Sequence, residues 1–234
     1  MSRARFTPHT LRHGQEPIRL FKSDILEFFT HIYPPAVLLL FVPIVLFFLG
    51  RGVGGLGGSY GIGAVAMAFA AGIAIWTFTE YVMHRFVFHY EPKGRFLQRV
   101  WFLLHGVHHE QPQCKSRLLM PPLMSVPLAL AFFGLFHAIV GVALGLPLVV
   151  APLYAGFVAG YLAYDMLHYA EHHLPLKGGA LRYLKRYHLL HHFKTPDDCF
   201  GVSSPLHRCM MGSAPVDRLL VLNVYAVPAL SQSL

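Results

Sequence analysis

Four long apolar stretches alternate with polar ones along this chain. The apolar stretches cover about residues 28–49, 62–83, 118–144 and 148–167. About 20 apolar residues are enough for a helix to cross the hydrocarbon core of a bilayer, so each stretch predicts one transmembrane helix. The pattern therefore favours an all-α membrane protein with four spans, whose polar stretches lie outside the membrane.

The connection between the first two spans is rich in glycine. Residues 50–63 include Gly52, Gly54 and Gly57, which have the spacing of a dinucleotide-binding loop. That motif follows a β-strand and precedes an acidic residue that binds the ribose, and the sequence offers neither. We interpret these residues as a flexible link between two spans.

Composition agrees with a membrane protein and places the chain in one domain. The 234 residues are 55% hydrophobic and only 13% charged, with a mean hydropathy of +0.49. We expect one membrane domain over residues 28–234, preceded by a basic arm over residues 1–27 that lies on an anionic membrane surface. The three cysteines form no CxxC pair, so neither a disulfide framework nor a thiolate metal site is expected.

The positive charges indicate how the four spans are oriented. Of the 19 lysines and arginines, 18 fall before the first span, between the second and third, or after the fourth, and only Arg51 lies on the other side. The positive-inside rule makes the charged side cytoplasmic, in the inner membrane of a bacterium or the endoplasmic reticulum of a eukaryote. The net charge of +8 thus reports topology, and no nucleic-acid partner is expected.

Histidines gather in four short groups, all on the predicted cytoplasmic side. The groups read HRFVFH at 84–89, HGVHH at 105–109, HYAEHH at 168–173 and HLLHH at 188–192, and they hold 11 of the 16 histidines. On a helix, residues i and i+4 share one face, so pairs such as His105 with His109 can chelate one ion. So dense a set of imidazoles favours two adjacent metal ions.

These strings resemble a known family. EYVMHRFVFH, LHGVHHEQP, RLLMPP, GYLAYDMLHYAEHH, LKRYHLLHHF and FGVSSPL are similar to the fatty acid hydroxylase and sterol desaturase superfamily of membrane-bound, histidine-rich oxygenases, most closely to its fatty acid 2-hydroxylases. The resemblance covers about residues 80–213. It implies a four-helix membrane domain with a cytosolic helical cap that holds a dinuclear metal site.

Spacing and resemblance together suggest five histidine ligands for each ion. One set is His84, His89, His105, His109 and His191, and the other is His108, His168, His172, His188 and His192. His173 is left as a nearby or surface residue. Glu80, Asp165 and Glu171 are expected to accept hydrogen bonds from ligand imidazoles, which would fix the tautomers. For Glu80 and Asp165 the alternative is solvation at the ends of the spans.

The bilayer supplies acyl chains as possible substrates, and their chemistry limits the reactions that such a site can perform. A methylene C–H is far too weak an acid for a histidine base, so oxygen insertion requires a redox metal and O2. Iron is expected for catalysis, although zinc can fill such a site in purified protein. The resemblance implies hydroxylation at the second carbon of an acyl chain, commonly that of a ceramide-type sphingolipid, with electrons from a separate donor protein because this chain leaves no room for a haem domain.

Two departures from the family pattern and several alternatives remain at this point. Cys114 stands where relatives usually have Asp, and His207 and Arg208 follow SSPL where they usually have Trp-Asp. Both departures lie outside the histidine groups, so they bear on substrate choice or donor docking and leave metal binding unaffected. The alternatives are a sterol or carotenoid hydroxylase or desaturase of the same superfamily, a metal transporter, and a non-catalytic metal- or haem-binding membrane protein.

Overall fold

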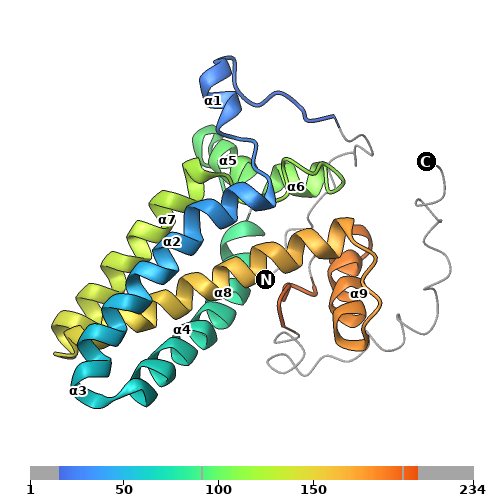
Figure 1. Ribbon diagram of the computed structural model, residues 1–234. Coiled ribbons are helices and arrows are strands. Elements are labelled where there is room, and N and C mark those ends of the chain that lie inside the picture. The colour runs from blue at the N-terminus through green and yellow to red at the C-terminus, as the bar shows by residue number, and fades with distance from the viewer. Residues whose placement is uncertain (1–15, 91, 197, 205–234) are drawn as a thin grey trace.

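The computed structural model describes residues 16–90, 92–196 and 198–204, and every regular element among them is helical (Figure 1). In chain order the elements are α1 (Asp24–Phe28), α2 (Pro34–Gly52), the π-helix η1 (Val53–Gly57), α3 (Gly58–Tyr60), α4 (Ile62–Val82), π-helix η2 (Met83–Phe88), α5 (Arg95–Trp101), π-helix η3 (Phe102–Gly106), α6 (Val107–Glu110), α7 (Pro122–Phe136), π-helix η4 (His137–Ala143), α8 (Pro147–His173) and α9 (Gly179–Phe193). Outside the described residues lie the part of the basic arm before residue 16 and the residues His207, Arg208 and Cys209.

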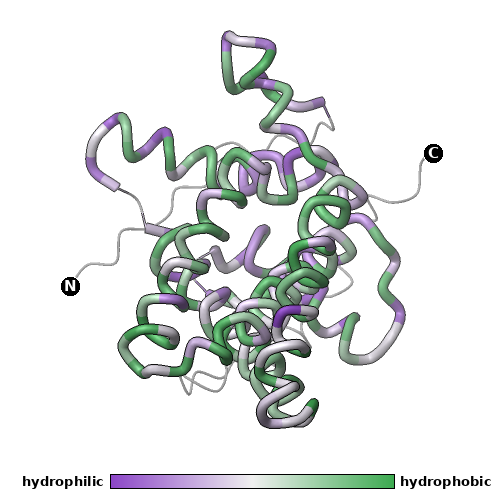
Figure 2. The backbone as a smooth tube through the Cα atoms, turned by 60° about the vertical axis from the view of Figure 1, so that its left-hand side comes forward, coloured by the Kyte–Doolittle hydropathy of each residue, from purple (hydrophilic) through white to green (hydrophobic). Residues whose placement is uncertain are grey.

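Four helices are long and apolar enough to cross a membrane. They are Pro34–Tyr60, Ile62–Phe88, Pro122–Ala143 and Pro147–His173. Large apolar side chains of these helices are exposed, including Leu39, Met67 and Leu130. Figure 2 shows that hydrophobic residues recur along the helical tubes. Apolar side chains on an outer face suit a lipid environment. The protein is therefore an integral membrane protein, and the prediction of four spans is confirmed.

The first span differs from the sequence prediction at both ends. It begins at Pro34 instead of residue 28, because residues 24–28 form the separate helix α1, and the chain is extended at Tyr33 just before the prolines. The interpretation of residues 50–63 as a flexible link is wrong. This stretch is helical up to Tyr60, and the chain turns at Gly61, whose φ of +83° belongs to the left-handed region that glycine adopts without strain.

Helix α8 lies at the centre of the bundle. In its most apolar 18-residue window, 67% of residues are buried, against 22% or less for the other three spans. It approaches α4 so closely that a Cβ atom at Gly156 would lie 1.9 Å from the Phe69 carbonyl oxygen, and one at Gly72 would lie 2.1 Å from that of Leu153. Backbone contact of this kind is typical of small residues between membrane helices.

The helices outside the spans gather at one end of the bundle. Figure 1 shows α5, α6 and α9 at the end where α8 finishes, while α3 lies at the opposite end. The second and fourth spans both finish on the side of this helical cap, so the bundle brings the histidines at their ends to the histidines of the cap.

Candidate metal centre

The first histidine pair is placed by a change of helical pitch at the end of the second span. His84 lies within η2 and His89 directly follows it, five residues along the chain. In an α-helix, residues five apart point in clearly different directions, whereas the wider π-turn brings positions i and i+5 onto nearly the same side. The spacing of these two histidines in the sequence gives no sign of the π-turn that brings them together.

The cap and the fourth span supply the other eight ligand candidates. His105 lies in η3, and His108 and His109 follow in α6. The remaining five come from two helices: His168 and His172 from α8, and His188, His191 and His192 from α9. All ten side chains are buried except that of His89, which is partly buried.

The ten ring nitrogens gather into two compact groups, within each of which the atoms lie within 4.8 Å of one another. The groups are His84, His89, His105, His109 and His191, and His108, His168, His172, His188 and His192. These are the same two sets that spacing and resemblance suggested. That each set binds one ion stays a prediction at this point.

Distances within the groups suit metal coordination. In the first group, His84 Nε2 lies 3.1 Å and His109 Nε2 lies 2.9 Å from His105 Nε2. In the second, His108 Nε2 lies 2.9 Å from His192 Nε2 and 3.0 Å from His168 Nε2. Two ligands about 2.1 Å from one ion and at a right angle lie about 3.0 Å apart. The residues present therefore fit a pair of histidine-bound metal ions.

Burial keeps these imidazoles in the form that binds metals. Five histidines of the cap have a pKa well below the usual 6.5, because burial removes them from water and because charge on neighbouring imidazoles lowers the pKa further. These five are His105, His108, His109, His188 and His192. The pKa of His191 is lowered by burial as well, although its hydrogen bond to a carbonyl opposes the shift. Neutral imidazole has a free lone pair on one ring nitrogen, which is the atom that binds a metal.

Two ligand candidates have their tautomer fixed by backbone carbonyls. His84 Nδ1–H donates to the Phe200 carbonyl oxygen at 2.5 Å, and His191 Nδ1–H donates to that of Asp198 at 2.7 Å. Each Nε2 is therefore left with its lone pair directed toward the group. These two carbonyls could not be predicted from the sequence, because a backbone acceptor can belong to any type of residue, although Phe200 lies in the FGVSSPL string of the resemblance.

Glu80 forms hydrogen bonds with the loop that contains Phe200. Its Oε1 accepts hydrogen bonds from the backbone N–H groups of Val202 and Ser203, each at 2.8 Å, and its Oε2 accepts one from the Ser203 hydroxyl. A hydrogen bond from a ligand imidazole to Glu80 stays a prediction, and the hydrogen bonds shown here are a less direct connection to the site. Glu80 holds the loop at residues 200–203, and that loop presents the Phe200 carbonyl to His84.

The other expected acceptors lie near the site without a visible hydrogen bond to a ligand. Asp165 and Glu171 are buried, and neither Glu171 oxygen has a partner among the described residues. The Nδ1 atoms of His108, His172, His188 and His192 also have no acceptor there. His173 belongs to neither group, and its ring packs 4.8 Å from that of Tyr169.

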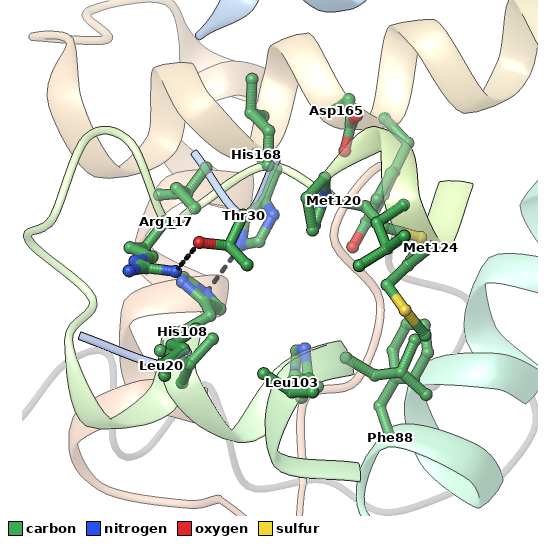
Figure 3. Close-up of a pocket in the computed structure, with 18 of the residues that line it drawn as sticks. Leu20, Thr30, Phe88, Leu103, His108, Arg117, Met120, Met124, Asp165 and His168 are labelled. Atoms are coloured by element: carbon green, nitrogen blue, oxygen red, sulfur yellow. Dashed lines mark hydrogen bonds between the residues drawn. The ribbon is translucent and has the colours of Figure 1, made fainter. Parts of the chain in front are cut away.

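A cavity opens beside the second group (Figure 3). His105, His108 and His168 line it, together with apolar side chains that include Phe88, Leu103, Met120 and Met124. A second, almost wholly apolar cavity lies among the spans and is lined by Trp76, Phe132 and Phe157. Phe88, Met120 and Tyr164 line both cavities, so the apolar cavity among the spans lies next to the cavity that the histidines line.

Comparisons of sequence and of structure with known proteins lead to the same family. The family described as Fatty acid hydroxylase matches residues 69–213. Dihydroceramide fatty acyl 2-hydroxylase FAH1 of Arabidopsis thaliana is 35% identical over 204 residues, which are 87% of this chain and 83% of that protein. Fatty acid 2-hydroxylase of Mus musculus is 35% identical over 209 residues, which are 81% of this chain and 55% of that protein. A solved structure of full-length scs7p, in which only the hydroxylase domain is visible, superposes with a TM-score of 0.73 at 33% identity and covers 82% of this chain and 70% of that one.

Fold and site together define an integral membrane protein with two histidine groups arranged to hold metal ions. The sequence matches show to which family within this class the chain belongs. The chain belongs to the fatty acid hydroxylase family, whose members are oxidoreductases that hydroxylate lipids.

Proposed function

We propose that this protein is a fatty acyl 2-hydroxylase that uses O2 and a histidine-bound pair of metal ions. The observation that carries the proposal is a cavity lined by His105, His108 and His168 from the two histidine groups, beside a second, apolar cavity among the spans. The names of the relatives, which include dihydroceramide fatty acyl 2-hydroxylase, support an acyl chain of a sphingolipid as substrate. They favour this substrate over a sterol or carotenoid.

The reaction replaces one C–H bond by C–OH. One atom of O2 enters the product, and the other leaves as water after two electrons and two protons are taken up. A pair of redox-active ions, for which we propose iron, supplies O2 activation when bound. Zinc has no redox chemistry, so zinc in a purified sample would mark the site without supporting turnover.

The chain itself binds and orients the substrate and excludes water. The apolar cavities receive the acyl chain, and the walls formed by Phe88, Met120 and Tyr164 direct it past His108 and His168. The buried histidines hold the ions in a region from which water is largely excluded. We further propose that the two electrons come from a separate donor protein and that the cap faces the cytoplasm.

The proposal is tested by lipid analysis of membranes that contain the full-length protein. Ceramides with an unlabelled acyl chain or with deuterium at C2 are incubated with the membranes, NADH or NADPH and a donor system, and the products are analysed by mass spectrometry. We expect a product one oxygen heavier that has lost deuterium from C2. A product lighter by two hydrogens indicates a desaturase and overturns the proposal, as does hydroxylation of a sterol or carotenoid alone.

Metal analysis forms the second part of the test. Protein purified without oxygen should contain two metal ions per chain, with iron needed for activity. A sharp visible band of haem, or full activity of the metal-free protein, contradicts the proposed centre.

A further inference from the structure

The cavity that the histidines line has one wall from the part of the chain before the first span. Leu20, Phe21 and Thr30 line this cavity together with the histidines. All three belong to residues 16–31, which we call the N-terminal strap, and Leu20 and Phe21 form its tip. The strap is therefore part of the same cavity as the candidate metal centre, although none of the ligand histidines lies in it.

The tip of the strap is held in place from two sides. Glu27, in the strap itself, accepts hydrogen bonds from the backbone N–H groups of Leu20 and Phe21, at 2.9 and 2.8 Å. Arg99 of α5 donates to the Leu20 carbonyl oxygen at 3.3 Å, and its guanidinium carbon lies 5.6 Å from the centre of the Phe21 ring. A cation over the face of an aromatic ring is attracted to it. The tip is thus fixed both by the strap and by the cap.

The rest of the strap is anchored by a buried arginine. Arg117 is 3% exposed, and it donates to the Ile18 carbonyl oxygen at 2.8 Å and to a Glu27 carboxylate oxygen at 2.5 Å. Hydrogen bonds between charged groups are stronger than neutral ones. Gln111 accepts from the Ile18 N–H at 3.0 Å and donates to the Glu16 carbonyl oxygen at 2.8 Å. These contacts make the strap a fixed wall of the cavity.

The strap lies at the end of this cavity that is turned away from the apolar cavity among the spans. Phe88, Met120 and Tyr164 line both cavities, whereas none of residues 16–31, all of which the structure describes, lines the second one. In the view of Figure 3, Leu20 lies on the side of His108, and Phe88 lies across the cavity from it. The histidines therefore lie between a strap end and a span end.

Hydroxylation at the second carbon requires the two parts of the substrate to leave the histidines in different directions. The second carbon is bonded to the acyl carbonyl carbon on one side and to the hydrocarbon tail on the other. The carbonyl and the group attached to it, which we call the head, therefore stay close to the histidines. The tail suits the almost wholly apolar cavity among the spans. The head is then left with the end that the strap closes.

We propose that the head of the lipid substrate packs against Leu20 and Phe21, so that these two side chains limit the size of the group attached to the acyl carbonyl. This inference rests on the proposed function. Both side chains are apolar, and they suit the hydrocarbon part of a long-chain base joined to the acyl group through an amide. The strap thus determines specificity for the head, whereas the cavity among the spans receives the tail.

Two series of ceramides test this division. One series keeps the acyl chain and enlarges the head, from dihydroceramide to the same lipid with a hexose on its terminal hydroxyl. The other keeps the head and varies the length of the acyl chain. For each lipid, kcat/KM and the position of the new hydroxyl group are measured with the full-length protein in membranes.

Leu20→Ala and Phe21→Ala each enlarge the strap end. We expect the ratio of kcat/KM for the glycosylated lipid to that for dihydroceramide to rise about tenfold, the lower end of what a change in the fit of one apolar group is worth. The preferred acyl length should stay the same, and hydroxylation should stay at the second carbon. An unchanged ratio in both variants, or a shift in the preferred acyl length instead, overturns the inference.

Two further variants serve as matched controls. Ile25→Ala removes an exposed side chain of the same strap that does not line the cavity, so both preferences should be those of the wild type. Phe132→Ala enlarges the apolar cavity among the spans, so it should change the preferred acyl length and leave the head ratio as it is. An equal rise of the head ratio in Ile25→Ala or in Phe132→Ala would overturn the role of the two strap side chains.

A measurement on the wild-type protein is independent of how the variants fold. One photoreactive ceramide carries a diazirine in the base beside the amide, and another carries it at the end of the acyl chain. After illumination, mass spectrometry identifies the labelled peptides. We expect the first probe to label residues 16–31 and the second to label the spans. A first probe that does not label the strap overturns the inference. If both probes label as expected but no 2-hydroxy product forms, the proposed function fails instead, so the two failures are distinguished.

Discussion

His84 and His191 illustrate how single residues prepare this centre. In each, one ring nitrogen donates to a backbone carbonyl and the other lies within a group of imidazole nitrogens. Such an arrangement fixes ring orientation and leaves a lone pair where a metal can accept it. Because burial also removes the competing proton, neutral imidazoles are present near neutral pH without an external base.

Replacing one ligand histidine should therefore prevent its group from binding a metal ion. We predict that His108→Ala or His188→Ala abolishes hydroxylation, with about one metal ion or fewer left per chain, while the protein still inserts into the membrane. His137→Ala is the control, since this histidine begins η4, far along the chain from the cap, and belongs to neither group. Metal analysis and activity are measured together, and full activity in either ligand variant would remove the metal assignment.

The lowered pKa values of the cap histidines predict how stability responds to acid. In the folded, metal-depleted protein these imidazoles stay neutral, whereas in the unfolded chain they gain protons below about pH 6.5. The unfolded state then binds more protons, so stability falls as the pH decreases through that value and changes little above it. Thermal unfolding of the metal-depleted protein between pH 5 and 8.5 measures this, and a melting temperature that rises on acidification contradicts it.

At the scale of elements, the contact between α4 and α8 sets the distance between histidines from different spans. The second span carries His84 and His89, and α8 carries His168 and His172. The two helices touch through the backbone at Gly72 and Gly156, where no side chain would fit. Backbone contact over this short distance lets the ends of both spans reach the same cap.

Gly156→Ala should force these helices apart. The new methyl group would lie 1.9 Å from the Phe69 carbonyl oxygen, so the helices must shift. Overpacking of this kind costs roughly 1–3 kcal/mol of stability, and we also expect weaker metal retention. Gly134→Ala in α7 is the matched control, because nothing lies within 4 Å of its added Cβ. It should be neutral or slightly stabilising, by up to about 1 kcal/mol, owing to the better helix propensity of alanine. Equal melting temperatures and metal contents for the two variants would show that the close contact has no such role.

For the whole molecule, charge and fold together support one orientation in the membrane. Helix α9, whose sequence includes Arg182, lies at the end of the bundle where α8 finishes, whereas α3 lies at the opposite end (Figure 1). Positive charge is retained on the cytoplasmic side of membranes. The cap and both histidine groups would then face the cytoplasm, where a soluble or membrane-bound electron donor can reach them.

Cysteine labelling tests this orientation. Ser59 in α3 and Arg182 in α9 are both exposed, while the natural Cys114 and Cys199 are buried. In a Cys209→Ser background, Ser59→Cys should react with a membrane-impermeant maleimide added outside intact cells or sealed vesicles of right-side-out orientation. Arg182→Cys should react only after the membrane is opened. The reverse pattern would place the cap on the other side.

The sequence by itself determined the number of spans, the family and the set of histidines that gather, because hydrophobic length and short helical spacings are local properties that the chain carries without its fold. It could not locate the π-turn at η2, the helical course of residues 50–60, or the carbonyls of Phe200 and Asp198 that orient His84 and His191. The two carbonyl contacts join residues 7 and 116 positions apart through backbone atoms, and only the packing of the spans, the cap and the loop around Phe200 brings them within hydrogen-bonding distance.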